Sequence, residues 1–183
     1  MNLILEIKGQ LSEKCLNNSM AWASSVIATP GVEPVEIRID SNGGYTWGTT
    51  QFLNALELIK QKREVVTVTG FAASSAAFIF LAGDRRVITQ NGLINLHGVE
   101  MRMPIWALPT RELPDKDYTI GWQLQNRAER LIMETTSLAS AEIEKFMRTS
   151  KGKTFDAAMA MKYGIATEVE KVSEGQLLFE LAQ

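Results

Sequence analysis

Ser74 and His97 are the residues of this 183-residue chain whose types and surroundings best suit nucleophilic catalysis. Ser74 lies in Gly70-Phe-Ala-Ala-Ser-Ser-Ala-Ala77, where an expected strand ends at a glycine and small residues begin an apolar helix. His97 is the only histidine and ends the apolar run Leu93-Ile-Asn-Leu-His97. A serine hydroxyl becomes nucleophilic when a base accepts its proton. The pattern therefore predicts Ser74 as a nucleophile and His97 as its base.

The N–H groups of Gly44 and Ser75 are the expected donors to an oxyanion, the negatively charged oxygen that forms when a carbonyl is attacked. Ser75 begins the apolar helix, and Gly44 ends the segment Ser41-Asn-Gly-Gly44, whose missing side chains would let a substrate backbone approach closely. Each pattern also has an ordinary explanation. Small residues pack helices closely, a lone histidine commonly forms a surface hydrogen bond, and Gly-Gly commonly makes a turn.

Composition and charge argue against several other classes of function. The 19 basic and 21 acidic residues leave a net charge of −2, without the positive charge that attracts nucleic acids or anionic membranes. The longest apolar run, Phe71–Ala82, is shorter than the roughly 20 residues that span a bilayer, and it predicts a buried helix. One histidine and one cysteine, Cys15, cannot form the usual zinc site, so we expect no metal and no cofactor. The N-terminal sequence lacks the features of a signal peptide, which predicts an intracellular, cytoplasmic protein.

Strand and helix patterns alternate along the chain. The expected strands cover residues 3–8, 35–40, 65–70, 87–88 and 93–96. The expected helices cover residues 12–28, 49–60, 73–82, 118–135, 140–147 and 156–163, with Ser12, Ser140 and Asp156 as N-caps. This alternation predicts an α/β fold, a layered structure of repeated βα units with a mostly parallel sheet and a helical C-terminal part, in one domain over residues 1–183. Residues 100–117 hold three prolines and predict a loop or an ordered excursion from that domain.

Four segments match, in order, the motifs of one peptidase family. They are Ile37–Gly44, with Asn42 where that family usually has proline; Gly70–Ala77, with Ser74 at the nucleophile position; Ile94–His97, ending at the catalytic histidine; and Ala157–Ile165. On these segments the chain resembles the Clp protease proteolytic subunit family, serine peptidases with a crotonase-like (ClpP-like) fold. The resemblance spans nearly the whole chain, and phage-encoded head-maturation peptidases look closer still.

This resemblance implies a serine endopeptidase that cleaves peptide or protein substrates through Ser74 and His97, with Gly44 and Ser75 as oxyanion donors. It also implies a homo-oligomeric ring that encloses the active sites. Family members carry an extra N-terminal segment that docks an ATPase ring, whereas the first strand here is expected almost at Met1. Partnership with an ATPase unfoldase is therefore not favoured.

The third member of the family's catalytic triad is missing from its expected position. In the family an acidic residue stands eleven positions before the tyrosine of the last motif, and counting back from Tyr163 gives Gly152. An orienting carboxylate fixes the histidine tautomer and stabilises the imidazolium, so its absence predicts weak activity, a substitute or an inactive enzyme. Asp156 is the nearest acid, and capping a helix is its expected role.

Two ways of orienting the imidazole remain without that acid. The hydroxyl of Ser150, or a backbone carbonyl of residues 149–153, could accept the imidazole N–H and keep the tautomer. A carboxylate introduced by Gly152→Asp is expected to approach His97 and raise the rate of hydrolysis.

Other assignments of the same residues stay open. Lys116 could be the base of a Ser-Lys dyad, although a lysine beside an aspartate is usually solvated. A crotonase-like enzyme acting on acyl-CoA thioesters would use the oxyanion hole without Ser74. A catalytically silent structural subunit would account for the missing acid. Three tryptophans could line a peptide groove or an oligomer contact: Trp47, Trp106 and Trp122.

Overall fold

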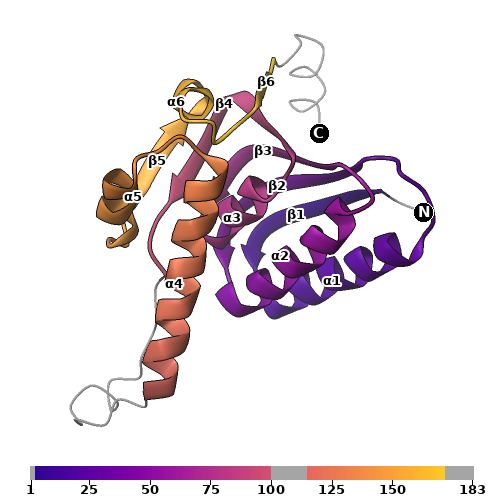
Figure 1. Cartoon of the computed structure of the whole chain (residues 1–183). Helices are drawn as coiled ribbons and strands as arrows, with labels where there is room; N and C mark the ends of the chain where they lie inside the picture. The colour runs from indigo at the N-terminus through magenta and orange to yellow at the C-terminus, as the bar shows by residue number, and fades with distance from the viewer. Residues whose placement is uncertain (1–2, 100–114, 172–183) are drawn as a thin grey trace.

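A computed structural model of the chain describes residues 3–99 and 115–171 (Figure 1). Its strands are β1 (Ile4–Leu11), β2 (Val35–Gly44), β3 (Val65–Ala73), β4 (Arg85–Leu96), β5 (Lys153–Asp156) and β6 (Glu168–Glu170). Its helices are α1 (Glu13–Ala28), α2 (Thr46–Lys60), α3 (Ser75–Leu81), α4 (Asp115–Thr135), α5 (Ser140–Met147) and α6 (Ala157–Lys162). Strand and helix alternate through the first two thirds of the described chain, as the sequence predicts.

The strands form one mostly parallel sheet in the order β1-β2-β3-β4-β5. The β1–β2, β2–β3 and β3–β4 pairs are parallel. The free edge of β4 is shared by two short strands, because β6 pairs in parallel with residues 87–89 and β5 pairs antiparallel with residues 93–96. The α/β fold predicted from the sequence is confirmed, and all the carboxyl ends of β1 to β4 meet at one edge, where ligand sites of such sheets form.

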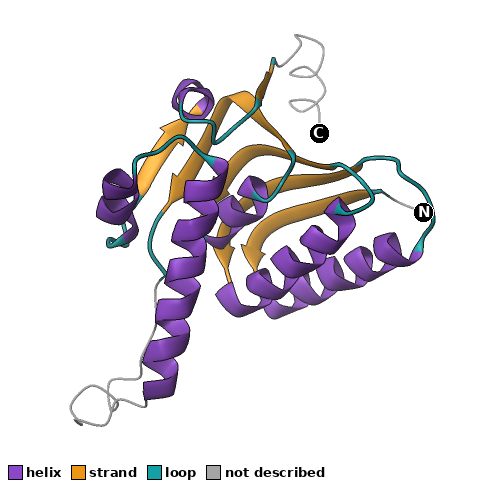
Figure 2. Cartoon of the chain, in the orientation of Figure 1, coloured by secondary structure: helices purple, strands orange, loops and turns teal. Residues whose placement is uncertain are grey.

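Helices α1 and α2 lie side by side across one face of the sheet (Figure 2). Residues of β2 alternate between buried and more exposed, and Val35, Ile37 and Ile39 belong to the buried core. The side chain of Ser12 caps α1 by accepting a hydrogen bond from the Cys15 N–H at 3.2 Å, as predicted. This packing fixes the ends of the strands and so positions the groups that follow them.

Helix α3 is buried along its whole length, from Ser75 to Leu81. The buried helix predicted within the apolar run is confirmed, but it begins at Ser75 and not at residue 73, because residues 71–73 still belong to β3. Within residues 3–99 and 115–171, no helix has both the length and the apolar character needed to cross a membrane.

Several strands are longer than their sequence patterns predict. Residues 41–44 lie beyond the strand expected at 35–40, and they continue β2 because Gly43 and Gly44 pair with Gln10 and Leu11 of β1. The two short strands expected at 87–88 and 93–96 are parts of one strand, β4. Residues 85–88 pair with residues 66–69 of β3 and residues 93–95 pair with residues 71–73, with a shift of register between the two stretches. The prediction of two strands was wrong because the backbone stays extended through the polar residues 90–92, which the apolar pattern does not report.

The C-terminal part is less helical than predicted. Two short strands lie where no strand was expected: β5 between α5 and α6, and β6 after α6. Asp156 caps α6 as predicted, since its Oδ1 accepts a hydrogen bond from the Met159 N–H at 2.8 Å. The cap predicted for α5 was wrong: Ala139 is the N-cap, Ser140 is the first helical residue, and no side chain caps this helix.

Candidate active site

Ser74 occupies a strained turn between β3 and α3. Its backbone angles are φ 56° and ψ −133°, and among the described residues it alone has a positive φ without being glycine. Such a conformation costs free energy and persists where neighbouring contacts enforce it. Here the Ser74 N–H donates to the Asn95 carbonyl at 3.0 Å, and the Ser74 carbonyl accepts from the Ala77 N–H at 3.0 Å. The turn places the Ser74 side chain at the carboxyl edge of the sheet, off the end of the helix.

The glycines at the end of β2 allow this turn to pack directly against that strand. A Cβ atom on Gly43 would lie 2.6 Å from both the Ala73 carbonyl oxygen and the Ser74 Cβ. Gly43 also has a φ of 87°, which disfavours any other residue. In this structure the missing side chain of Gly43 therefore makes room for the Ser74 turn, whereas the sequence predicted room for a substrate backbone.

Gly44 and Ser75 form a reciprocal pair of hydrogen bonds. The Gly44 N–H donates to Ser75 Oγ at 3.0 Å, and Ser75 Oγ donates to the Gly44 carbonyl at 2.9 Å. The Ser75 side chain is buried. The Gly44 N–H, expected as an oxyanion donor, is thus engaged by a hydroxyl in this structure, whereas the Ser75 N–H belongs to the first turn of α3 and has no acceptor within the helix.

His97 follows the last residue of β4, and its ring is oriented by its own neighbour. The His97 Nδ1 atom lies 2.7 Å from the Gly98 carbonyl oxygen. A carbonyl only accepts hydrogen bonds, so Nδ1 carries the proton and Nε2 is left as the basic nitrogen. A backbone carbonyl orients the imidazole, as one of the sequence alternatives proposed, but it comes from residue 98 and not from residues 149–153.

The position of the missing acid lies directly against His97 but has no room for a side chain. A Cβ atom on Gly152 would overlap the Leu96 carbonyl oxygen and the His97 Cβ, and would lie 2.8 Å from the His97 Cα. Gly152 also has a φ of 62°. A side chain at residue 152 meets backbone, so Gly152→Asp cannot supply a carboxylate without displacing its neighbours, and its effect on hydrolysis stays a prediction.

No other acid replaces it among the side chains that the structure describes: none of these carboxylates forms an ion pair or hydrogen bond with the His97 ring. Asp156 is committed to capping α6. The Lys116 side chain and Trp106 lie outside the described residues, so the Ser-Lys alternative stays a prediction. Cys15, whose thiol could also act as a nucleophile, is half-buried, and burial raises the pKa of that thiol.

The four predicted site residues line one cleft of about 540 Å³: Gly44, Ser74, Ser75 and His97. Trp47 lies on the same cleft and is half exposed, which suits contact with a peptide side chain. Trp122 is exposed elsewhere on α4. The structure thus brings together groups from the ends of β2, β3 and β4.

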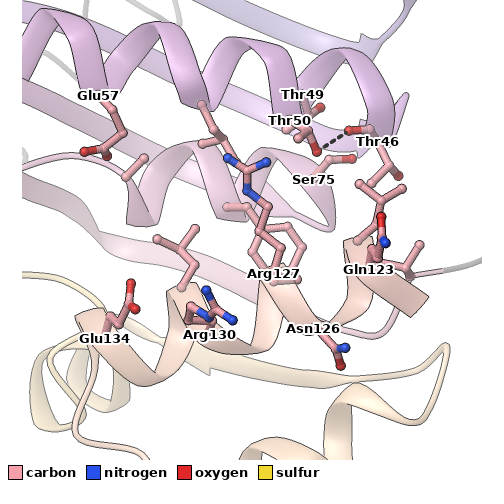
Figure 3. A pocket seen from close by; sticks show the side chains of 17 residues that line it. Thr46, Thr49, Thr50, Glu57, Ser75, Gln123, Asn126, Arg127, Arg130 and Glu134 are labelled. Carbon is pink, nitrogen blue, oxygen red and sulfur yellow. Dashed lines mark hydrogen bonds between the residues drawn. The ribbon is translucent and has the colours of Figure 1, made fainter. Parts of the chain in front are cut away.

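A second hollow of about 580 Å³ adjoins this cleft between α2 and α4 (Figure 3). Both hollows are lined by Thr46, Ser75, Phe78, Val99 and Leu124. Figure 3 shows charged side chains reaching into the second hollow from both helices, among them Glu57 from α2 and Arg127 from α4. The sequence could not predict that these residues face one hollow, because β3, α3 and β4 separate the two helices along the chain.

In the described part of the chain, no three His, Cys, Asp or Glu side chains cluster in a way that could hold a metal ion. The arrangement at the cleft instead suits a serine nucleophile beside an imidazole whose Nδ1 is held by the Gly98 carbonyl. In comparisons with known proteins, the family model described as Clp protease matches residues 3–173 of the chain. No curated protein matches the sequence.

Proposed function

Since the chain belongs to the Clp protease family, whose members are in general serine peptidases, we propose that it cleaves peptide bonds with Ser74 as nucleophile and His97 as base. One observation carries the proposal. A strained serine at a strand end lines the same cleft as the only histidine, whose Nδ1 proton is already engaged. A general base needs its free nitrogen on the side of the nucleophile, and Nε2 is the nitrogen left free.

In the acylation step, Ser74 Oγ forms a bond to the carbonyl carbon of the peptide while its proton passes to His97 Nε2. The electron pair of the C=O bond moves to oxygen. When this pair returns, the C–N bond breaks, and the imidazolium gives its proton to the leaving amine. Water then repeats the sequence on the acyl-enzyme and releases the acid product, which restores the Ser74 hydroxyl.

The oxyanion would be held by the Ser75 N–H and, after a change of partner, by the Gly44 N–H. The Gly44 N–H donates to Ser75 Oγ in this structure, so an oxyanion has to displace a neutral hydroxyl from it. A negatively charged oxygen is a stronger acceptor than the hydroxyl, which favours the exchange, but the bond that breaks offsets part of the stabilisation that a free donor would give the transition state.

Turnover should be slow because a backbone carbonyl, and not a carboxylate, faces the imidazole. The Gly98 carbonyl keeps the imidazole in the productive tautomer. In a Ser-His-Asp site the wrong tautomer lowers turnover by a factor of about 10⁴, and this chain should avoid that loss. The Gly98 carbonyl supplies only a partial charge to stabilise the imidazolium. Activity below that of a complete triad, but above background, is the expected result.

A second candidate is a catalytically silent member of the family. Two observations favour it: the engaged Gly44 N–H, and the lack of a carboxylate on His97 among the described side chains. An acyl-CoA enzyme has no specific observation in its favour.

Proteins of this family generally act on peptides and form rings. We propose a homo-oligomeric ring for this chain too, which light scattering in solution would test.

Hydrolysis of a short fluorogenic peptide and of a peptide ester tests the proposal. Wild type should hydrolyse the ester, Ser74→Ala should not, and His97→Gln should lose most of the rate. Ser137→Ala, which changes an exposed serine far along the chain, is the control and should keep wild-type activity. Full activity in Ser74→Ala would contradict the assignment, and no activity in wild type would favour the silent subunit.

A further inference from the structure

The peptide unit that joins Gly98 to Val99 lies between the His97 ring and a glutamine of α4. Its carbonyl oxygen accepts from His97 Nδ1 at 2.7 Å, and its N–H donates to Gln125 Oε1 at 2.7 Å. A peptide unit is planar and rigid. Whatever fixes its N–H therefore also fixes the carbonyl that orients the imidazole.

Three partners set the orientation of the Gln125 side-chain amide. Its Oε1 accepts from the Val99 N–H, and its Nε2 donates to the Met147 carbonyl at 3.0 Å and to the Glu129 carboxylate at 2.7 Å. An amide turned the other way would place oxygen against two acceptors and nitrogen against a donor. The three bonds therefore agree on one orientation, which joins Val99 to Glu129 through the amide.

Close packing keeps Gly98 in this place. A Cβ atom on Gly98 would overlap the carbonyl oxygen of Met147, the last residue of α5, and would lie 3.4 Å from Gln125 Oε1. The Gly98 N–H points to the Thr149 carbonyl at 3.4 Å. The segment that carries His97 is therefore held between α4 and the end of α5.

We propose that Gln125 and Glu129 are positioning residues for His97, which take the place of the missing triad acid through two amide groups. The inference rests on the proposed role of His97 as base. Hydrogen bonds in series polarise one another, by about 10–30% per bond. The Glu129 carboxylate strengthens the Gln125 amide as an acceptor for Val99, and this polarises the Gly98 carbonyl that holds His97 Nδ1. His97 Nε2 is then kept free to act as the base in the cleft that Ser74 also lines.

Kinetics of the peptide ester test the proposal in the full chain. Gln125→Leu removes all three bonds and should lower kcat on the order of 10²-fold, the size of effect that a small displacement of a catalytic group produces, with KM nearly unchanged. Glu129→Gln keeps the shape and removes the charge, so its loss should be smaller. Gln61→Leu and Glu144→Gln are matched controls at exposed positions and should leave kcat unchanged.

An exchange of the two groups separates positioning from general stability. Gln125→Glu alone sets two carboxylates against each other and should lose activity, while the double variant Gln125→Glu/Glu129→Gln restores a carboxylate–amide pair next to Val99. The double variant should recover part of the kcat that Gln125→Glu loses, although both variants lose the bond to Met147. No recovery of kcat would contradict the series of bonds.

The single histidine allows a readout that does not need activity. In ¹⁵N-histidine NMR, wild type should show the Nδ1–H tautomer, and Gln125→Leu should show a mixture of tautomers. An Nε2–H tautomer in wild type, or an unchanged spectrum in a folded Gln125→Leu, would overturn the proposal whatever the enzyme does. Conversely, ester hydrolysis that survives Ser74→Ala would overturn the proposed function and leave the NMR result to decide the role of Gln125.

Discussion

Replacement of Gly152 by alanine should destabilise the protein more than the same change at Gly9. Both glycines are in the left-handed region, with φ of 62° and 70°, and this conformation costs a residue with a Cβ about 1–2 kcal/mol. At Gly9 nothing lies within 4 Å of the added Cβ, so that cost stands alone. At Gly152 the Cβ meets the backbone of Leu96 and His97, and overpacking adds about 1–3 kcal/mol. Gly152→Ala should therefore lose about 2–5 kcal/mol.

Urea unfolding at one protein concentration measures both variants against wild type. The free energy of unfolding should fall further in Gly152→Ala than in Gly9→Ala, with similar dependence on urea. Ester hydrolysis should fall in Gly152→Ala and in Gly152→Asp, because the added atoms displace His97. Equal destabilisation of the two alanine variants would refute the packing argument. A Ser74-dependent gain of activity in Gly152→Asp would show that the backbone yields and the carboxylate reaches the imidazole.

Three further predictions follow from buried or paired polar groups. Arg86 donates to backbone carbonyls that follow α3 and α6, and burial lowers the pKa of its guanidinium. Arg86→Met should lower the free energy of unfolding in urea by about 3 kcal/mol, and an unchanged free energy of unfolding would contradict this. Ser75→Ala leaves the N–H and C=O of Gly44 without their partner, and should lower the free energy of unfolding by about 1–3 kcal/mol. Hydrogen bonds from the backbone N–H of Glu33 itself and, next in size, from Arg63 lower the pKa of the Glu33 carboxyl. The ionised carboxylate therefore stabilises the folded protein above the ordinary pKa of 4.5, and this stabilisation is lost as pH falls through the lower pKa of the folded state. Glu33→Gln should weaken the loss of stability in acid, and an unchanged pH dependence would contradict that assignment.

The fold was predictable where local pattern and tertiary pairing agree. The strands and helices from β1 to α3 follow from alternating and helical spacing, and Ser12 and Asp156 cap helices as their types predict. The short strands β5 and β6 were missed because three or four residues carry too little pattern to identify a strand. They form because the free edge of β4 offers backbone partners, which depends on the whole sheet.

The candidate site was predictable in its members and not in its hydrogen bonds. Residue type and motif order predict Ser74, Ser75, Gly44 and His97, and these four residues line one cleft. The Ser75–Gly44 pair was not foreseeable, since it depends on how closely β2 packs on the Ser74 turn. Gln125 gave no signal either, because nothing in its helix spacing shows that it meets the backbone after His97.

The most direct test of the central claim is the site at which a fluorophosphonate reacts. Such a probe forms a covalent bond with a serine oxygen that a base has activated. Wild type should take up one probe per chain, and mass spectrometry of its peptides should locate it on Ser74, with no uptake in Ser74→Ala and slow uptake in His97→Gln. Labelling of another residue, or no labelling of the folded wild type, would contradict the assignment of Ser74 and His97 as the nucleophile and its base.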